Sequence, residues 1–171
     1  MRPSPGRRAV ADITRRIAGK AASYLEDGEV VQAVVLCEPK GTLGVTSAAM
    51  VALPRVTSKV LADRATEAYA AAGGMARGLP GKPFVVIATD RRVLVAASNG
   101  LRLDEPCAAY PLGALRLEAL PGGFIGRKLR LAFVDGTDAV VDVQRGQPLE
   151  RAALAVAGSG APPKVGGGGV A

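Results

Sequence analysis

A tight polar corner between two apolar segments constrains this chain more than any other feature. Residues 84–89 read FVVIAT and residues 93–97 read VLVAA, with Asp90, Arg91 and Arg92 between them. β-Branched residues favour a pleated, half-buried surface, and aspartate tolerates the backbone geometry of a turn. The pattern predicts an antiparallel hairpin of two strands, Phe84–Thr89 and Val93–Ala97.

Further short segments predict the rest of a β-rich domain. An apolar run before residue 38 indicates a strand that is buried on both sides. Period-two alternation and an Asp135-Gly136 turn indicate strands near the C-terminus, and a loop over 98–106 separates these from the hairpin. Strands at this spacing indicate a closed or nearly closed antiparallel sheet, plugged by a helix that starts at Pro148. The additional predicted strands are 29–37, 107–111, 114–120, 128–134 and 138–143.

An amphipathic helix is predicted over residues 4–27. Ser4 suits the N-cap and Pro5 the first helical position, where the missing N–H loses no hydrogen bond. The helix either packs on the sheet with a solvated cationic face or lies on an anionic membrane. Its modest apolar side, without Trp or Phe, favours packing on the sheet. The apolar stripe is Val10, Ile13, Ile17, Ala21 and Tyr24.

An Ala- and Gly-rich insert at 41–82 separates the first strand from the hairpin. Periodicity leaves 41–54 open between helix and strand, whereas 59–72 indicates a helix. An insert of this size is either functional or a packing accessory. The domain plan is an N-terminal helix at 1–28, a domain at 29–157 that contains the insert, and a flexible Gly/Pro-rich tail at 158–171. The stripe of the insert helix is Leu61, Ala65, Ala68, Tyr69 and Ala72.

The residue types restrict the chemistry that the chain can perform. Of the 171 residues 49% are hydrophobic, and none is His. Without imidazole there is no Ser–His or Cys–His nucleophile pair and no His-based zinc site. The two cysteines, Cys37 and Cys107, are expected to be buried free thiols, with a disulfide left open as the alternative. We expect no enzymatic activity, no cofactor and no bound metal.

The formal net charge of +7 is concentrated near the N-terminus, where residues 1–26 hold six basic and two acidic residues. Anionic lipid and nucleic acid both attract such a segment. Nucleic acid is the less favoured partner, because stacking platforms need aromatic residues and the chain has three Tyr, three Phe and no Trp. Charged residues interrupt any signal-peptide core, and the longest uncharged apolar stretch before the hairpin, Leu43 to Leu53, is too short to span a bilayer. We expect a cytoplasmic protein.

Four segments together suggest a known fold. They are DGEVVQAVV after the first helix, VIATDRRVLVAAS, AAYPLGALRLEAL, and RKLRLAFVDGTDAVVDV before the last helix. Within them stand the corner Thr89-Asp90-Arg91-Arg92-Val93, the step Pro111-Leu112-Gly113-Ala114-Leu115 and the turn Asp135-Gly136. In this order and with these motifs, the chain resembles the bacterial pleckstrin-homology-like (PH-like) domains over about residues 24–157, apart from the insert. The resemblance implies an α+β fold, a seven-stranded antiparallel β-barrel or sandwich capped by a C-terminal helix. This superfold serves lipid, peptide and protein binding alike.

Two hypotheses for function follow. The favoured one is protein interaction or self-assembly, as a homo-oligomer or with a protein partner, through the insert and the sheet edges. The alternative is peripheral binding to anionic membrane lipid through the basic N-terminal helix. Against a phosphoinositide site, residues 27–81 hold five basic and five acidic residues. Candidate contacts for an anion or lipid are Arg7, Arg8, Arg15, Arg16, Arg91, Arg92, Arg127 and Lys128.

Overall fold

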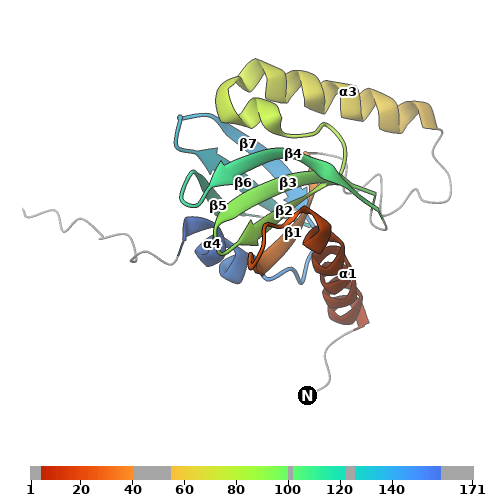
Figure 1. The fold of residues 1–171 in the computed structure, drawn as a ribbon. Helices are drawn as coiled ribbons and strands as arrows, with labels where there is room; N and C mark the ends of the chain where they lie inside the picture. Colours follow the sequence, from red (N-terminus) through yellow and green to blue (C-terminus); the bar gives the residue numbers. More distant parts are fainter. Residues whose placement is uncertain (1–4, 41–54, 100–101, 122–125, 159–171) are drawn as a thin grey trace, which may run out of the picture.

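A computed structural model describes residues 5–40, 55–99, 102–121 and 126–158 of the protein (Figure 1). These residues form a seven-stranded antiparallel sheet with helices packed around it, which confirms the α+β class. In chain order the elements are α1 (Pro5–Ala21), the 3-10 turn η1 (Ala22–Tyr24), β1 (Val31–Pro39), α3 (Arg55–Ala72), the 3-10 turn η2 (Gly74–Gly78), β2 (Phe84–Thr89), β3 (Arg92–Ser98), β4 (Leu103–Pro111), β5 (Leu115–Leu120), β6 (Arg127–Phe133), β7 (Asp138–Val143) and α4 (Leu149–Ala157).

The seven strands form one open sheet in the order β4-β3-β2-β1-β7-β6-β5. Each neighbouring pair is antiparallel, and the predicted hairpin is confirmed as β2 and β3. The sheet was predicted to be closed or nearly closed. The closed alternative is excluded, because β4 and β5 are the two edges of the sheet and no ladder joins them among the described residues. Two strand edges therefore remain without a neighbouring strand.

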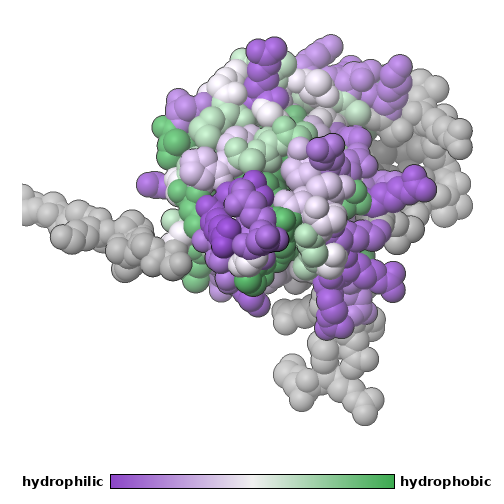
Figure 2. Space-filling model, viewed as in Figure 1, coloured by the Kyte–Doolittle hydropathy of each residue, from purple (hydrophilic) through white to green (hydrophobic). Residues whose placement is uncertain are grey.

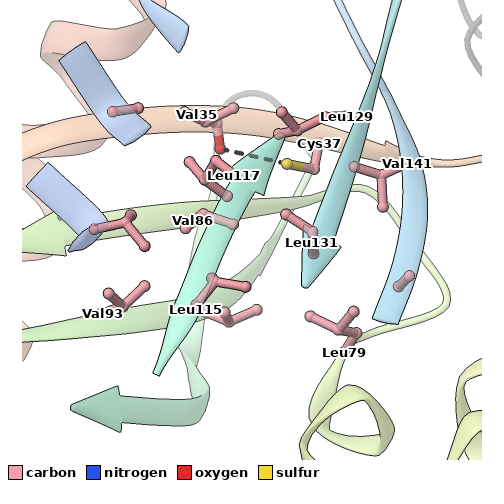
Figure 3. Close-up of a cluster of buried hydrophobic side chains, with 14 of the residues drawn as sticks. Val35, Cys37, Leu79, Val86, Val93, Leu115, Leu117, Leu129, Leu131 and Val141 are labelled. Carbon is pink, nitrogen blue, oxygen red and sulfur yellow. Dashed lines mark hydrogen bonds between the residues drawn. The ribbon is translucent and has the colours of Figure 1, made fainter. Parts of the chain in front are cut away.

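The main core lies between the two halves of the curled sheet (Figure 3). Val86 and Val93 from β2 and β3 pack in one cluster with Leu115, Leu131 and Val141 from β5, β6 and β7. All five side chains are fully buried, and burial of each Val or Leu contributes about 1.5–3 kcal/mol. The C-terminal helix α4 covers this core, as predicted, with the buried side chains of Leu149, Ala152 and Val156.

The helix α1 covers the opposite face of β1, β2 and β3. Since successive strand residues point to opposite faces, Val34 enters this second cluster while Val35 enters the main core. This confirms that the first strand is buried on both sides. The regular helix ends at Ala21, earlier than predicted, and the expected cap at Ser4 falls outside the described residues. The buried residues of the second cluster are Ile17, Ala21, Val34, Val85, Ile87, Leu94 and Ala96.

The insert helix α3 and the turn η2 are tied to the rest of the domain by a few contacts. The Met75 N–H donates to Asp135 Oδ2 at 2.6 Å, and the Tyr110 hydroxyl donates to the Met75 carbonyl at 2.8 Å. Gly81 passes so close to α3 that a Cβ there would overlap the Ala62 carbonyl oxygen. The insert therefore contains a packed accessory element, at least over α3 and η2.

Part of the predicted α3 stripe is exposed. Tyr69 is buried and Ala65 packs against the core, but Ala68 and Ala72 are exposed. The helix contacts the sheet mainly through its C-terminal turns and η2. The rest of the predicted apolar stripe therefore has no sheet surface to pack against.

Three local expectations are wrong. β4 already begins at Leu103, where a loop to residue 106 was expected, because irregular pairing with β3 accommodates the non-alternating sequence LDEP. β1 runs on through Pro39, which pairs opposite Val141 at the strand end, where a missing N–H is tolerated. Cys37 is buried as expected, but Cys107 is exposed because it lies on an edge strand; both thiols are free.

Candidate functional site

The hairpin corner is organised around a buried carboxylate, Glu29. Arg92 Nε donates to Glu29 Oε1 at 3.0 Å and Arg92 Nη2 to Oε2 at 2.9 Å, and the Thr89 hydroxyl donates to Oε1 at 2.7 Å. The Glu26 N–H adds a bond to Oε2 at 2.8 Å. The Glu29 side chain has no exposed surface. Hydrogen bonding from Arg92 is the main reason that its pKa falls from the ordinary 4.5 to about 2. The hydrogen bonds of Glu29 therefore hold the segment before β1 against the β2–β3 turn.

The two arginines of this corner already have acidic partners. Arg92 bonds Glu29 and also lies 3.2 Å from Glu26, and its side chain is 27% exposed. Arg91 is about half exposed, and its Nη1 lies 3.6 Å from Glu26 Oε2. An external anion has to compete with these carboxylates. The ion pairs with Glu26 and Glu29 within the fold are therefore sufficient to explain why two arginines stand at this corner.

Two of the candidate arginines of α1, Arg15 and Arg16, face solvent. Asp12, whose Oδ1 lies 3.9 Å from Arg15 Nη1, offers only a weak solvent-screened pair. Arg7 and Arg8 belong to the first turns of the same helix. Figure 2 shows hydrophilic residues gathered over α1. No helix within the described ranges is both long enough and apolar enough to cross a membrane.

The third predicted group lies at the start of β6. Lys128 is half-buried and shares the solvent-facing side of the strand with the exposed Arg130, whereas Arg127 is on the other side and is exposed at the end of the strand. The eight candidate residues thus occupy α1, the β2–β3 corner and β6. Among the described residues, no hydrogen bond or ion pair joins one of these groups to another. The structure does not assemble them into a single anion site.

The two sheet edges differ in their capacity to accept another strand. β4 contains Pro106 and Pro111, which lack the N–H of a ladder, and its pairing with β3 is irregular in two places. It also carries Asp104 and Glu105, and natural edges are commonly protected by such charges, prolines and bulges. β5 has no proline and pairs with β6 in an unbroken register. β5 is therefore the more regular of the two edge strands.

Hydrogen bonds at the end of the β5–β6 ladder fix which backbone groups of β5 point outward. The Val134 N–H donates to the Ala114 carbonyl at 3.0 Å, and the Phe133 N–H donates to the Thr137 carbonyl at 2.9 Å. Because antiparallel residues alternate between bonded and non-bonded pairs, the even-numbered residues of β5 bond to β6. The backbone groups of Leu115, Leu117 and Ala119 therefore point away from β6. Leu115 has no exposed surface and Leu117 is only 8% exposed, so the open part of this edge is at Ala119, which is exposed.

Two strongly exposed hydrophobic residues lie in segments that are hydrogen-bonded to the residues just before β5. Val134 is 68% and Leu154 is 75% exposed, the highest values for large hydrophobic residues in the described ranges. The Val134 N–H donates to the Ala114 carbonyl. Leu154 belongs to α4, in which the Val156 carbonyl accepts the Gly113 N–H at 3.0 Å. These two residues are exposed apolar surface that the core does not use.

The sequence predicted a strand over 114–120 and named the sheet edges in general, but it did not identify this strand as an edge or single out Val134 and Leu154. The available signals were the proline-free segment 115–120, in contrast to 103–111, and the position of Leu154 outside the apolar stripe of α4. No family model matches this chain, and neither a curated protein nor a solved structure matches it. The candidate function must therefore be argued from the geometry alone.

Proposed function

We propose that this chain is a non-catalytic binding module with a PH-like fold, and that it works by protein interaction, including self-association. The PH-like assignment is supported by the antiparallel order of seven strands followed by a terminal helix. It is supported also by the place of the Thr89–Val93 motif at the β2–β3 corner. The absence of His from the whole sequence supports a non-catalytic role.

The open end of the β5 edge, around Ala119, carries this proposal. An edge strand exposes a row of unpaired N–H and C=O groups that can pair with a strand from another chain. β-Strand addition of this kind is a common mode of protein recognition, in which main-chain hydrogen bonds supply affinity. Val134 and Leu154 are further exposed apolar residues that are available to a protein partner.

Light scattering on a sizing column tests self-association. The full chain is expected to show a mass above 17.4 kDa that rises with protein concentration toward a discrete oligomer. A mass that stays at the monomer value over the whole accessible concentration range would overturn self-association as the function.

Peripheral membrane binding is the second candidate, and it rests on α1. Ile13, Ile17 and Ala21 of this helix already pack against β1–β3, so the contact with a bilayer that we consider is electrostatic, through residues such as the exposed Arg15 and Arg16. Flotation with vesicles of anionic or neutral lipid at physiological salt separates the two candidates. Binding to anionic vesicles that disappears when Arg7, Arg8, Arg15 and Arg16 are all replaced by Glu supports the membrane-binding hypothesis. A protein that floats with neither anionic nor neutral vesicles excludes this hypothesis.

A further inference from the structure

The insert elements α3 and η2 cover one end of the main core. Tyr69 of α3, Ala76 of η2 and Leu79 just after η2 are buried in the main core cluster, which also contains Tyr110 of β4 and Phe133 of β6. In Figure 1 the strands lie between α3 and α4, and Figure 3 shows Leu79 at the edge of the cluster. The core is therefore covered at two separate places, by α4 and by the insert.

Three hydrogen bonds hold η2 against β4 and the β6–β7 turn. The Met75 N–H donates to Asp135 Oδ2 at 2.6 Å, the Ala76 N–H donates to Thr137 Oγ1 at 3.2 Å, and the Tyr110 hydroxyl donates to the Met75 carbonyl at 2.8 Å. The Thr137 hydroxyl also donates to Asp135 Oδ1 at 2.7 Å, so the turn presents both acceptors in a fixed arrangement. The bond between Met75 and Asp135 is exposed, so water can replace it at little cost in free energy.

Much of α3 does not depend on the sheet. Val60 is 45% exposed, and Ala68 and Ala72 are exposed as well. The helix has 18 residues and is rich in Ala, the residue with the highest helix propensity. Its own sequence therefore supports the helical conformation, and separation of α3 from the sheet does not require the helix to unfold.

A buried hydroxyl group makes the docked position of α3 less favourable. Tyr69 is 6% exposed, and among the described residues its hydroxyl has no hydrogen-bond partner. Burial raises the pKa of Tyr69, and the neighbouring groups of Cys37 in β1 and Asp142 in β7 raise it further. In water the hydroxyl would be hydrogen-bonded, so leaving it unpaired in the core costs free energy. The docked state therefore carries a penalty that separation of α3 from the core removes.

We propose that α3 and η2 form a lid that leaves the core as one unit while the seven-stranded sheet stays folded. Segments that open in this way have exposed hydrogen bonds and few buried contacts, as this one has. Opening uncovers the end of the core at Tyr110 and Phe133, whose ring centroids lie 5.2 Å apart. The domain then presents an apolar surface that the closed state hides. This inference does not depend on the self-association proposed above.

Amide hydrogen exchange, measured by NMR at increasing urea concentrations, tests whether the lid opens separately. The amides of Met75 and Ala76 report docking, because their acceptors belong to the β6–β7 turn. The amide of Ile87, in the central part of β2, reports global unfolding. Relative to their intrinsic rates, Met75 and Ala76 should exchange at least about tenfold faster than Ile87, with little dependence on low urea, because the lid exposes less surface than global unfolding. Exchange at the Ile87 rate with the same urea dependence would overturn the lid.

The three tyrosines of the chain provide matched Tyr→Phe variants. Tyr69→Phe removes the unpaired hydroxyl and should slow exchange at the two η2 amides about tenfold. Tyr110→Phe removes the bond to the Met75 carbonyl but keeps the ring, and should speed the same exchange about fivefold. Tyr24→Phe, in η1 at the end of α1, is the control and should leave it unchanged. Circular dichroism checks that all three variants fold. The lid is refuted if Tyr69→Phe speeds the exchange, or if neither Tyr69→Phe nor Tyr110→Phe changes it.

Discussion

Replacing Glu29 with Gln tests whether the hairpin corner is held by a buried charge. The fall of the Glu29 pKa from 4.5 to about 2 corresponds, at full strength, to about 3 kcal/mol of stability above pH 5. Arg92 is 27% exposed, so solvent screens part of this interaction. We expect Glu29→Gln to lower the free energy of unfolding by about 2 kcal/mol at pH 7.

The sign of the pH dependence follows from the direction of the pKa shift. A carboxyl group whose pKa is depressed in the folded state stabilises the protein above its unfolded pKa and loses this contribution as the pH falls through the folded value. The difference between wild type and Glu29→Gln should therefore be complete above pH 5 and decline below about pH 4.5, toward zero near pH 2. Urea unfolding followed by circular dichroism at pH 7 and pH 3 measures it, and at pH 3 about half should remain.

Glu26→Gln is the matched control for this prediction. It removes the same charge from a carboxylate that contacts the same two arginines but is 59% exposed. Exposed ion pairs of this kind contribute about 1 kcal/mol or less. The reasoning is refuted if Glu29→Gln destabilises no more than Glu26→Gln, or if its effect is the same at both pH values.

Three further predictions concern packing and exposure. Gln147→Ala should lower the free energy of unfolding by about 2 kcal/mol in urea titrations, because the buried Gln147 amide accepts from the Leu36 N–H at 2.7 Å and donates to the Leu36 carbonyl at 2.8 Å; a loss below about half a kcal/mol contradicts this. Gly81→Ala should speed amide exchange across α3 and lower the melting temperature, because its Cβ has no room beside the helix backbone; unchanged exchange contradicts it. In thiol labelling followed by mass spectrometry, Cys107 should react in the native protein and Cys37 only after unfolding, because Cys107 is exposed and Cys37 buried; equal rates contradict this.

The sequence was sufficient to predict the elements whose pattern is local. Alternation and turn residues located β2, β3, β6 and β7 to within about a residue, because each side-chain period is read over one short segment. β4 was partly missed, since its irregular pairing with β3 removes the period-two signal. The sequence left open whether the sheet is closed or only nearly closed, because pairing between β4 and β5 depends on distant strands and on curvature, which no local pattern encodes.

The candidate site was less accessible to sequence reasoning than the fold. The Arg91-Arg92 pair has the pattern of an anion contact, but its buried partner Glu29 lies about sixty residues away along the chain. Likewise, Glu118 and Arg130 look like ordinary exposed strand residues until β5 and β6 pair and bring Arg130 Nη1 to 3.6 Å from Glu118 Oε2. Long-range pairing, and not residue type, gives these charges their roles.

Amide hydrogen exchange at β5, measured by NMR at low and at high protein concentration, tests the central claim most directly. The account predicts that the amide of Ala119 exchanges freely in the dilute protein and becomes protected as assembly proceeds, while those of Arg116 and Glu118, which bond to β6, are protected throughout. An Ala119 amide that stays unprotected in a sample shown by light scattering to be assembled would contradict it.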